Sequence, residues 1–165
     1  MSDARSVITV IVMIFALAIG ILIMLKVTDS MVTGMQNSDM VDYKYVNETL
    51  NSANTLQQGK SDTIFLGFFI ALVLGLIIAG YFATAYPIFV IFYIIALIVL
   101  GVISALLTYL WESISQSTTF LPYLSDIPVT NFIMSNLVMF MSVIGFITLI
   151  VMYIGYTKKM SRGGM

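Results

Sequence analysis

The stretch IFLGFFIALVLGLIIAGYFATAYPIFVIFYIIALIVLGVISALLTYL, residues 64–110, decides the fold, because it contains no Asp, Glu, Lys, Arg or His. It holds two apolar runs, residues 64–82 and 88–110, each of about 20 residues, the length that crosses the roughly 30 Å hydrocarbon core of a bilayer as a helix. Only residues 83–87 separate the runs, and Pro87 suits the first turn of a helix, where its missing N–H is not needed. The sequence therefore predicts two antiparallel transmembrane helices joined by a short turn.

Two further apolar runs flank this pair, at residues 7–26 and 132–156. The first is longer than the core of a signal peptide and no small-residue cleavage motif follows it, so we interpret it as a retained membrane helix. Together the four runs predict an all-α integral membrane protein with about four transmembrane helices and a central helical hairpin. Residues 1–165 are expected to form a single membrane domain.

The segments between the apolar runs are polar. They are loops at residues 27–62 and 112–131, and a short basic tail at residues 157–165. Apolar side chains at helical spacing within residues 41–57 predict a short amphipathic helix in the first loop. Asp62 or Thr63, just before the second run, is suited to cap the start of that helix.

The composition excludes several classes of function. Hydrophobic residues make up 60% of the chain and charged residues 9%, against roughly 25% charged residues in a soluble globular protein. The net charge of −1 gives no basic surface for nucleic acid. The chain has no His and no Cys, so it lacks the commonest metal and haem ligands, the usual general base and any thiol nucleophile. We predict no catalytic, cofactor-binding or metal site, and we expect neither a cofactor nor an enzymatic activity.

Orientation is predicted from the Lys and Arg residues near the membrane, which favour the cytoplasmic side. With four spans, both termini lie on the same side. That side carries Arg5, Lys158, Lys159 and Arg162, whereas the other carries Lys44 and Lys60, with Lys26 at the boundary. We therefore expect both termini on the cytoplasm-derived side. Trp111, just after the third run, fits the belt of aromatic side chains at a membrane interface.

Small residues recur at every fourth position of the second run, an arrangement that lets another helix backbone approach closely. They are Gly67, Ala71, Gly75, Ala79 and Ala83, with a shorter counterpart at Gly101 and Ala105 in the third run. This pattern predicts a helix-packing face, whose partner is either the other helix of the hairpin or another subunit. Chance is the alternative, because Gly and Ala are common in membrane helices.

The fourth run contains polar residues at a regular interval, Ser142, Gly145 and Thr148. They could line a pathway, but we favour hydroxyl groups that bond to their own helix or to a neighbour. Between their flanking residues the four runs contain no ionisable side chain, the kind of group that pumps and proton relays need inside the membrane. We therefore expect no ion transport by the chain alone. A glycosylation sequon at Asn47 matters only in a host that glycosylates that side.

Three short motifs carry a resemblance to a known group. They are Trp111-Glu112-Ser113 after the third run, Ile127-Pro128-Val129-Thr130-Asn131 before the fourth, and Val27-Thr28-Asp29-Ser30-Met31-Val32 after the first. With these the chain resembles small multi-span membrane proteins of unknown function from marine tailless icosahedral viruses with an internal lipid membrane. The resemblance implies a virion membrane protein beneath a capsid, and it carries over no functional residue.

The function we expect is structural. The protein would be part of a virion's internal membrane, and of the host cell membrane before assembly, where it organises the bilayer and links it to neighbouring proteins. Its partners would be the lipid bilayer, other membrane or capsid proteins, and, as an open alternative, further copies of itself. Two other functions stay open: a holin-like pore former for host lysis, and an accessory subunit of a cellular membrane complex.

Overall fold

The computed structural model describes residues 2–36, 44–82 and 88–162, and within these ranges it is helical with no strand. The elements are α1 (Ser2–Gln36), α2 (Lys44–Phe82), α3 (Ile88–Ser115), η2 (Leu121–Asp126), α4 (Pro128–Ser135) and α5 (Leu137–Arg162). Four helices are long and apolar enough to cross a membrane, with candidate spans at Ile8–Met35, Lys60–Tyr81, Tyr93–Ser115 and Leu137–Lys158. The predicted all-helical class with four such helices is confirmed.

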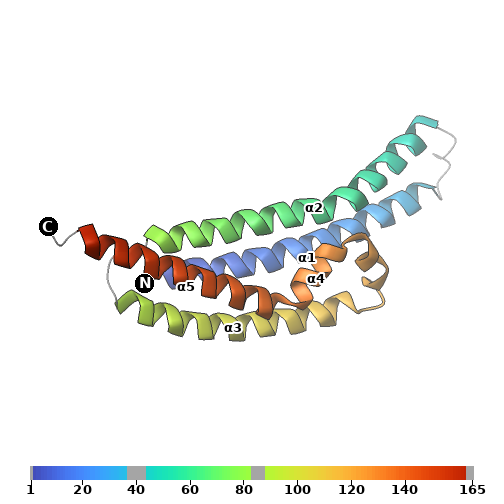
Figure 1. Cartoon of the computed structure of the whole chain (residues 1–165). Helices are drawn as coiled ribbons and strands as arrows, with labels where there is room; N and C mark the ends of the chain where they lie inside the picture. The colour runs from blue at the N-terminus through green and yellow to red at the C-terminus, as the bar shows by residue number, and fades with distance from the viewer. Residues whose placement is uncertain (1, 37–43, 83–87, 163–165) are drawn as a thin grey trace.

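The four long helices form a bundle in which α1 and α5 lie between α2 and α3 (Figure 1). Helix α1 packs against α2 and α3, and α5 packs against the same two helices. Helices α2 and α3 are consecutive in the chain, but they lie on opposite edges of the bundle. In the described residues, the two helices of the predicted central hairpin therefore pack mainly against other helices, not against each other. Each of its helices turns its inward face to α1 and α5 instead.

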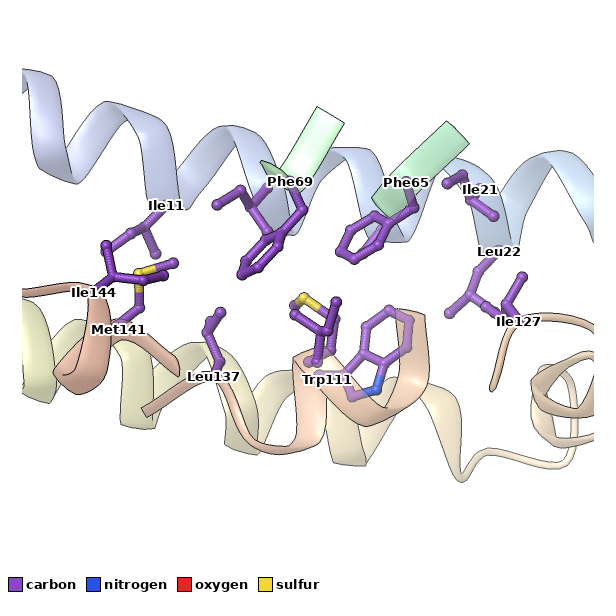
Figure 2. Packing of buried hydrophobic residues seen from close by; sticks show 14 of the residues in the cluster. Ile11, Ile21, Leu22, Phe65, Phe69, Trp111, Ile127, Leu137, Met141 and Ile144 are labelled. Carbon is purple, nitrogen blue, oxygen red and sulfur yellow. The ribbon is translucent and has the colours of Figure 1, made fainter. Parts of the chain in front are cut away.

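The core lies between the inward faces of all four long helices. On α1 the buried residues recur at helical spacing, including Ile11, Ile14, Ala18, Leu22 and Leu25, as expected for one buried stripe. Figure 2 shows Phe65 and Phe69 of α2 pointing toward Trp111 and Leu137 across this core. The Phe69 ring also meets the ring of Phe140 edge to face, with centroids 5.9 Å apart. Trp111 is fully buried, so its expected place in an interfacial aromatic belt is wrong.

The outer surface of the bundle is largely apolar along the candidate spans. Many large aliphatic and aromatic side chains along the spans are exposed, with Ile98 and Phe146 each 66% exposed. A soluble monomer rarely exposes large contiguous apolar patches. A bilayer solvates such a surface, and helices satisfy their own backbone hydrogen bonds within it.

The polar segment 27–62, predicted as a loop with at most a short helix, is mostly helical. Helix α1 continues to Gln36, and α2 begins at Lys44 and runs without a break into the second span. Residues 27–36 contain no Pro, and Val32 is buried at 5% exposure, so the continued helix still packs against the rest of the chain. Asp62 consequently lies within a helix and does not cap its start.

The segment 112–131, also predicted as a loop, contains two short helices (Figure 1). Pro122 lies in the first turn of η2 and Pro128 in the first turn of α4. The backbone N–H groups of a first turn have no partner within the helix, so proline, which has no N–H, is tolerated there. The fourth span is not a single helix from residue 132 as predicted. It breaks at Asn136, whose φ of −115° and ψ of 24° separate α4 from α5.

Candidate functional site

The predicted packing strip on α2 faces outward. Gly67, Ala71, Gly75 and Ala79 are exposed, and Ala83 lies outside the described residues. A Cβ atom added at Gly67 or Gly75 would meet nothing within 4 Å. On α3, Gly101 is half-buried with the same open space around a Cβ, and Ala105 is exposed. Within the described parts of the chain the strip packs on no other helix, so a partner in another subunit stays a prediction.

The close helix contacts lie at two other glycines. A Cβ atom added at Gly80 of α2 would come within 2.5 Å of the Thr148 methyl group on α5. One added at Gly145 of α5 would overlap the side chain of Leu97 on α3. These positions hold α5 between α2 and α3, as small residues do where membrane helices pack closely. The sequence pattern placed Gly145 and Thr148 on one face with Ser142, where we favoured hydrogen bonds of the hydroxyl groups, but it did not predict these close contacts.

The polar residues of the fourth span bond mainly to their own backbone. The hydroxyl of Thr148 donates to the carbonyl of Ile144 at 2.8 Å, and that of Ser142 donates to the carbonyl of Val138 at 2.7 Å. Thr148 is buried at 3% exposure. The predicted hydrogen bonds of hydroxyl groups to their own helix are confirmed for Ser142 and Thr148.

A cluster of polar contacts closes one end of the bundle, and we name it the polar cap: Lys26 and Asp29 of α1, Asp62 of α2, Trp111 of α3, and Tyr123, Thr130 and Asn131 of the segment that follows α3. It fastens η2 and α4 to the long helices, to α1 near its C-terminal end, to the middle of α2 at Asp62, and to α3 near its C-terminal end. Its contacts join residues far apart in the sequence, so they are tertiary contacts that local sequence patterns do not predict.

Asp62 supplies the N-terminal cap of α4. Its carboxylate accepts the backbone N–H of Val129 at 2.9 Å, and the backbone N–H and hydroxyl of Thr130 at 2.6 and 2.7 Å. The residue before the helix is Ile127, whose side chain cannot cap it. A carboxylate here also lies at the positive end of the helix dipole. The carboxylate of Asp62 on α2 thus caps the N–H groups that are usually capped by a Ser, Thr or Asp directly before the helix.

On the neighbouring side of the polar cap, η2 is fastened to α1. The Tyr123 hydroxyl donates to the carboxylate of Asp29 at 2.7 Å, and the Lys26 ammonium lies 5.5 Å from the centre of the Phe120 ring. The pKa of Tyr123 is raised mainly by this hydrogen bond to Asp29, and partial burial of the hydroxyl adds a smaller effect in the same direction. Partial burial, together with the nearby charge of Asp29, raises the pKa of Asp126.

The third part of the polar cap joins α3 to α4. The indole N–H of the buried Trp111 donates to the side-chain carbonyl of Asn131 at 3.0 Å. One turn back on α3, the Thr108 hydroxyl donates to the backbone carbonyl of Met134 at 3.3 Å, next to the break at Asn136. Side-chain donors from a neighbouring helix can compensate for backbone bonds lost at a break within a membrane span.

The chemistry that these groups offer is hydrogen bonding and charge, used to hold helices together. Across the described ranges, no group of three or more Asp and Glu side chains could hold a metal ion. An apolar groove of about 380 Å³ lies between α3 and α5, bordered by Leu97, Gly101 and Phe146 among others. Its one hydroxyl-bearing lining residue is Ser142, which already bonds to its own helix.

Comparison with family models, with curated proteins and with solved structures finds no match to this chain. The class is therefore defined by the structure alone. It is an all-helical chain with four helices long and apolar enough to cross a bilayer, fastened at one end by the polar cap.

Proposed function

We propose that this protein is a structural, non-enzymatic component of a lipid membrane that organises the bilayer and joins it to neighbouring proteins. One observation carries the proposal. The four candidate spans expose apolar side chains outward and bury apolar side chains inward, while the polar contacts of the polar cap lie at one end. Such a chain is suited to stand stably in lipid rather than to move charge through it.

The links to neighbouring proteins would come from the polar ends of the helices. Residues 44–59 of α2 precede the second candidate span, which begins at Lys60, and they form a helix about 24 Å long at 1.5 Å per residue. The end of α1 rises beside this part of α2 (Figure 1). A helical projection of this length can reach proteins that lie above the headgroups, such as a capsid or another membrane protein.

The membrane we propose is the internal membrane of a virion, reached through the host cell membrane. The support for it is the sequence resemblance to small membrane proteins of tailless icosahedral viruses. Purified particles of the source virus should contain the chain in many copies when their proteins are identified by mass spectrometry. Its absence from particles would remove the virion assignment. Co-purification with cofactor-bearing cellular proteins would replace it with the accessory-subunit function.

The proposed orientation places both termini on the cytoplasm-derived side. The chain has no Cys, so single cysteines can be introduced by Ser52→Cys, in the first part of α2, and by Gly163→Cys, in the tail. A membrane-impermeant thiol reagent should label the two positions from opposite faces. Labelling of both from the same face would contradict the four-span topology.

A vesicle experiment separates the structural function from the holin-like alternative. Purified protein in liposomes should retain a trapped dye. Residues 7–25, 64–82, 88–110 and 132–156 contain no Asp, Glu, Lys, Arg or His, and the hydroxyl groups of Ser142 and Thr148 are bonded within their own helix. Rapid dye release that rises with protein concentration would overturn the proposal in favour of a pore. Vesicles with the same protein load heated until the protein unfolds serve as the control for non-specific disturbance.

A further inference from the structure

We propose that the groove between α3 and α5 holds one acyl chain of a phospholipid, which enters from the leaflet whose headgroups are level with Tyr153. The inference rests on the proposed membrane function and deepens it. It assigns a lipid site to one place on the outer face of the bundle, with hydrocarbon in the groove and a polar headgroup near the Tyr153 hydroxyl.

Two exposed tyrosines mark levels that are one hydrocarbon thickness apart. Tyr109 of α3 is 70% exposed and Tyr153 of α5 is 62% exposed. The two helices run in opposite directions (Figure 1), and a Cβ atom added at Gly145 would overlap Leu97 between them. At 1.5 Å per residue, Tyr109 lies about 18 Å from Leu97 in one direction and Tyr153 about 12 Å from Gly145 in the other, so about 30 Å separate the two levels. The hydrocarbon core has this thickness, and tyrosine is enriched at both of its boundaries.

Helix α2 gives the same two levels independently. Tyr81 is 40% exposed, and a Cβ atom added at the preceding Gly80 would lie 3.6 Å from Met152 of α5. Tyr81 is therefore close to the level of Tyr153. About 28 Å back along α2 is Asp62, which belongs to the polar cap. With the proposed membrane function, hydrocarbon therefore surrounds the bundle between the polar cap and the level of these two tyrosines.

The groove lies between the two levels, on the side of Tyr153. On α5 it is bordered by Ser142, Phe146 and Leu149, and Tyr153 continues the same face of the helix at a spacing of four residues. From Tyr153 toward the polar cap, Leu149, Phe146 and Ser142 follow at about 6, 10 and 17 Å. Half of the hydrocarbon core is about 15 Å thick. The groove thus follows the path of an acyl chain from near the headgroups to the middle of the bilayer.

The lining of the groove is suited to hydrocarbon. Leu100 and Met141 form a floor that is 5% and 2% exposed. A Cβ atom added at Gly101 would meet nothing within 4 Å, so the absence of a side chain there keeps the space open. The hydroxyl of Ser142 already donates to the carbonyl of Val138, so it needs no partner from the occupant. No lining residue carries a charge.

The rim of the groove favours a single flexible chain over a helix from a second copy. Ile98 of α3 and Phe146 of α5 both border the groove, and each is 66% exposed. Membrane helices approach one another closely where small residues form the contact surface. Here two large side chains stand beside Gly101 and would hold another helix backbone away from it. An acyl chain can lie between them and gain contacts with the floor and with both sides.

The test uses phosphatidylcholine with a photoreactive diazirine in one acyl chain, and the protein in vesicles of ordinary phosphatidylcholine. After irradiation, mass spectrometry of the peptides locates the lipid adducts. Leu74 of α2 is the reference for ordinary lipid contact, because it is 53% exposed and lies about 10 Å from Tyr81, the same depth as Phe146 below Tyr153. Gly101→Leu fills the groove. Ala105→Leu adds bulk one turn further along α3, where Ala105 is exposed and borders no part of the groove.

With the diazirine at the middle of the acyl chain, Phe146 should carry about three-fold or more adduct than Leu74, because a chain in the groove has contacts on three sides. Gly101→Leu should reduce this ratio to about one, and Ala105→Leu should keep it. Equal adducts at Phe146 and Leu74 in the unsubstituted protein would overturn the inference, and this comparison holds even if Gly101→Leu is unstable. An excess at Phe146 that a folded Gly101→Leu retains would overturn it as well.

Further outcomes separate the occupant, the leaflet and the membrane function. A disulfide-linked dimer of Ile98→Cys that persists when the protein is highly diluted in lipid would place a second copy at the groove and overturn the inference. Moving the diazirine to the end of the acyl chain should shift adducts from Phe146 toward Ser142. A shift in the reverse direction would mean entry from the level of Tyr109 and would overturn the leaflet assignment. If neither Phe146 nor Leu74 carries any adduct, the proposed membrane function itself fails.

Discussion

Replacing Asp62 by alanine should loosen α4 from the bundle, and the structure sets the size of the effect. Asp62→Ala removes three hydrogen bonds to the first turn of α4. Water can replace the bond to Val129, which is 37% exposed, but not the two bonds to Thr130, which is 0% exposed. Hydrogen bonds to charged groups contribute about 1.5–3 kcal/mol each, and the lower end applies because Asp62 is only half-buried. We therefore expect a loss of about 2–3 kcal/mol in the free energy of unfolding.

The assay is unfolding in mixed micelles, combined with hydrogen exchange of the backbone amides. Asp62→Asn keeps an acceptor oxygen and loses the charge, so it should cost about 1 kcal/mol. Thr63→Ala changes the exposed neighbouring residue and is the matched control. In Asp62→Ala the amides of Val129 and Thr130 should exchange faster, while those in the middle of α5 should not. The capping role would be refuted if Asp62→Ala matched Thr63→Ala in both measurements.

Three further substitutions test the packing and the polar cap. Gly80→Leu should lower the thermal stability in detergent, because the new side chain forces α2 away from Thr148. Gly75→Leu should leave the thermal stability unchanged and weaken only self-association, which sedimentation measures. Equal losses of thermal stability in the two variants would contradict the placement of these glycines. Asp126→Asn should raise the unfolding temperature at pH 7, because a pKa raised in the folded state means that the charged carboxylate destabilises that state. The gain should fade as the pH falls through the raised pKa of the folded state, and it should be absent below roughly 3.9, the ordinary aspartate pKa, where Asp126 is protonated in both states. A gain that grows toward acid pH would show the opposite sign. Ser104→Ala should raise the free energy of unfolding by about 1 kcal/mol, because the Ser104 hydroxyl is fully buried and has no hydrogen-bond partner among the described residues; a comparable loss in the same unfolding titration would show that it does.

The sequence predicts the presence of the long helices better than it predicts where they end and which helices they pack against. An apolar run long enough for a bilayer identifies a span because backbone hydrogen bonding and hydrocarbon both require a helix there. The positions at which the helices end depend on tertiary contacts. Val32 packs inside the bundle and helix α1 passes Lys26 without interruption. A rule that ends a span at the first charge therefore placed the end of α1 too early.

The packing face and the polar cap illustrate a different limit. Spacing of small residues shows that Gly67 and Gly75 share a face, but not whether that face meets a helix or the surroundings. Likewise, Asp62 matched the pattern of a local cap, yet the helix that it caps begins 66 residues later in the chain, at Pro128. Local sequence patterns do not show which distant segment will pack beside a residue, so contacts of this kind can be identified only once the three-dimensional structure is known.

The order of the helices around the bundle has a consequence for biosynthesis. Helix α5 is synthesised after α1, α2 and α3, yet it lies between α2 and α3, which otherwise contact the bundle through α1 and the short helices of the preceding segment. Membrane helices insert one by one and then assemble side by side. During translation α1, α2 and α3 would stand in the bilayer as a three-membered arc with an open side, and arrival of α5 would close it. A chain released before residue 137 would keep that open side, so we expect quality-control proteases of the membrane to remove it faster than the finished chain.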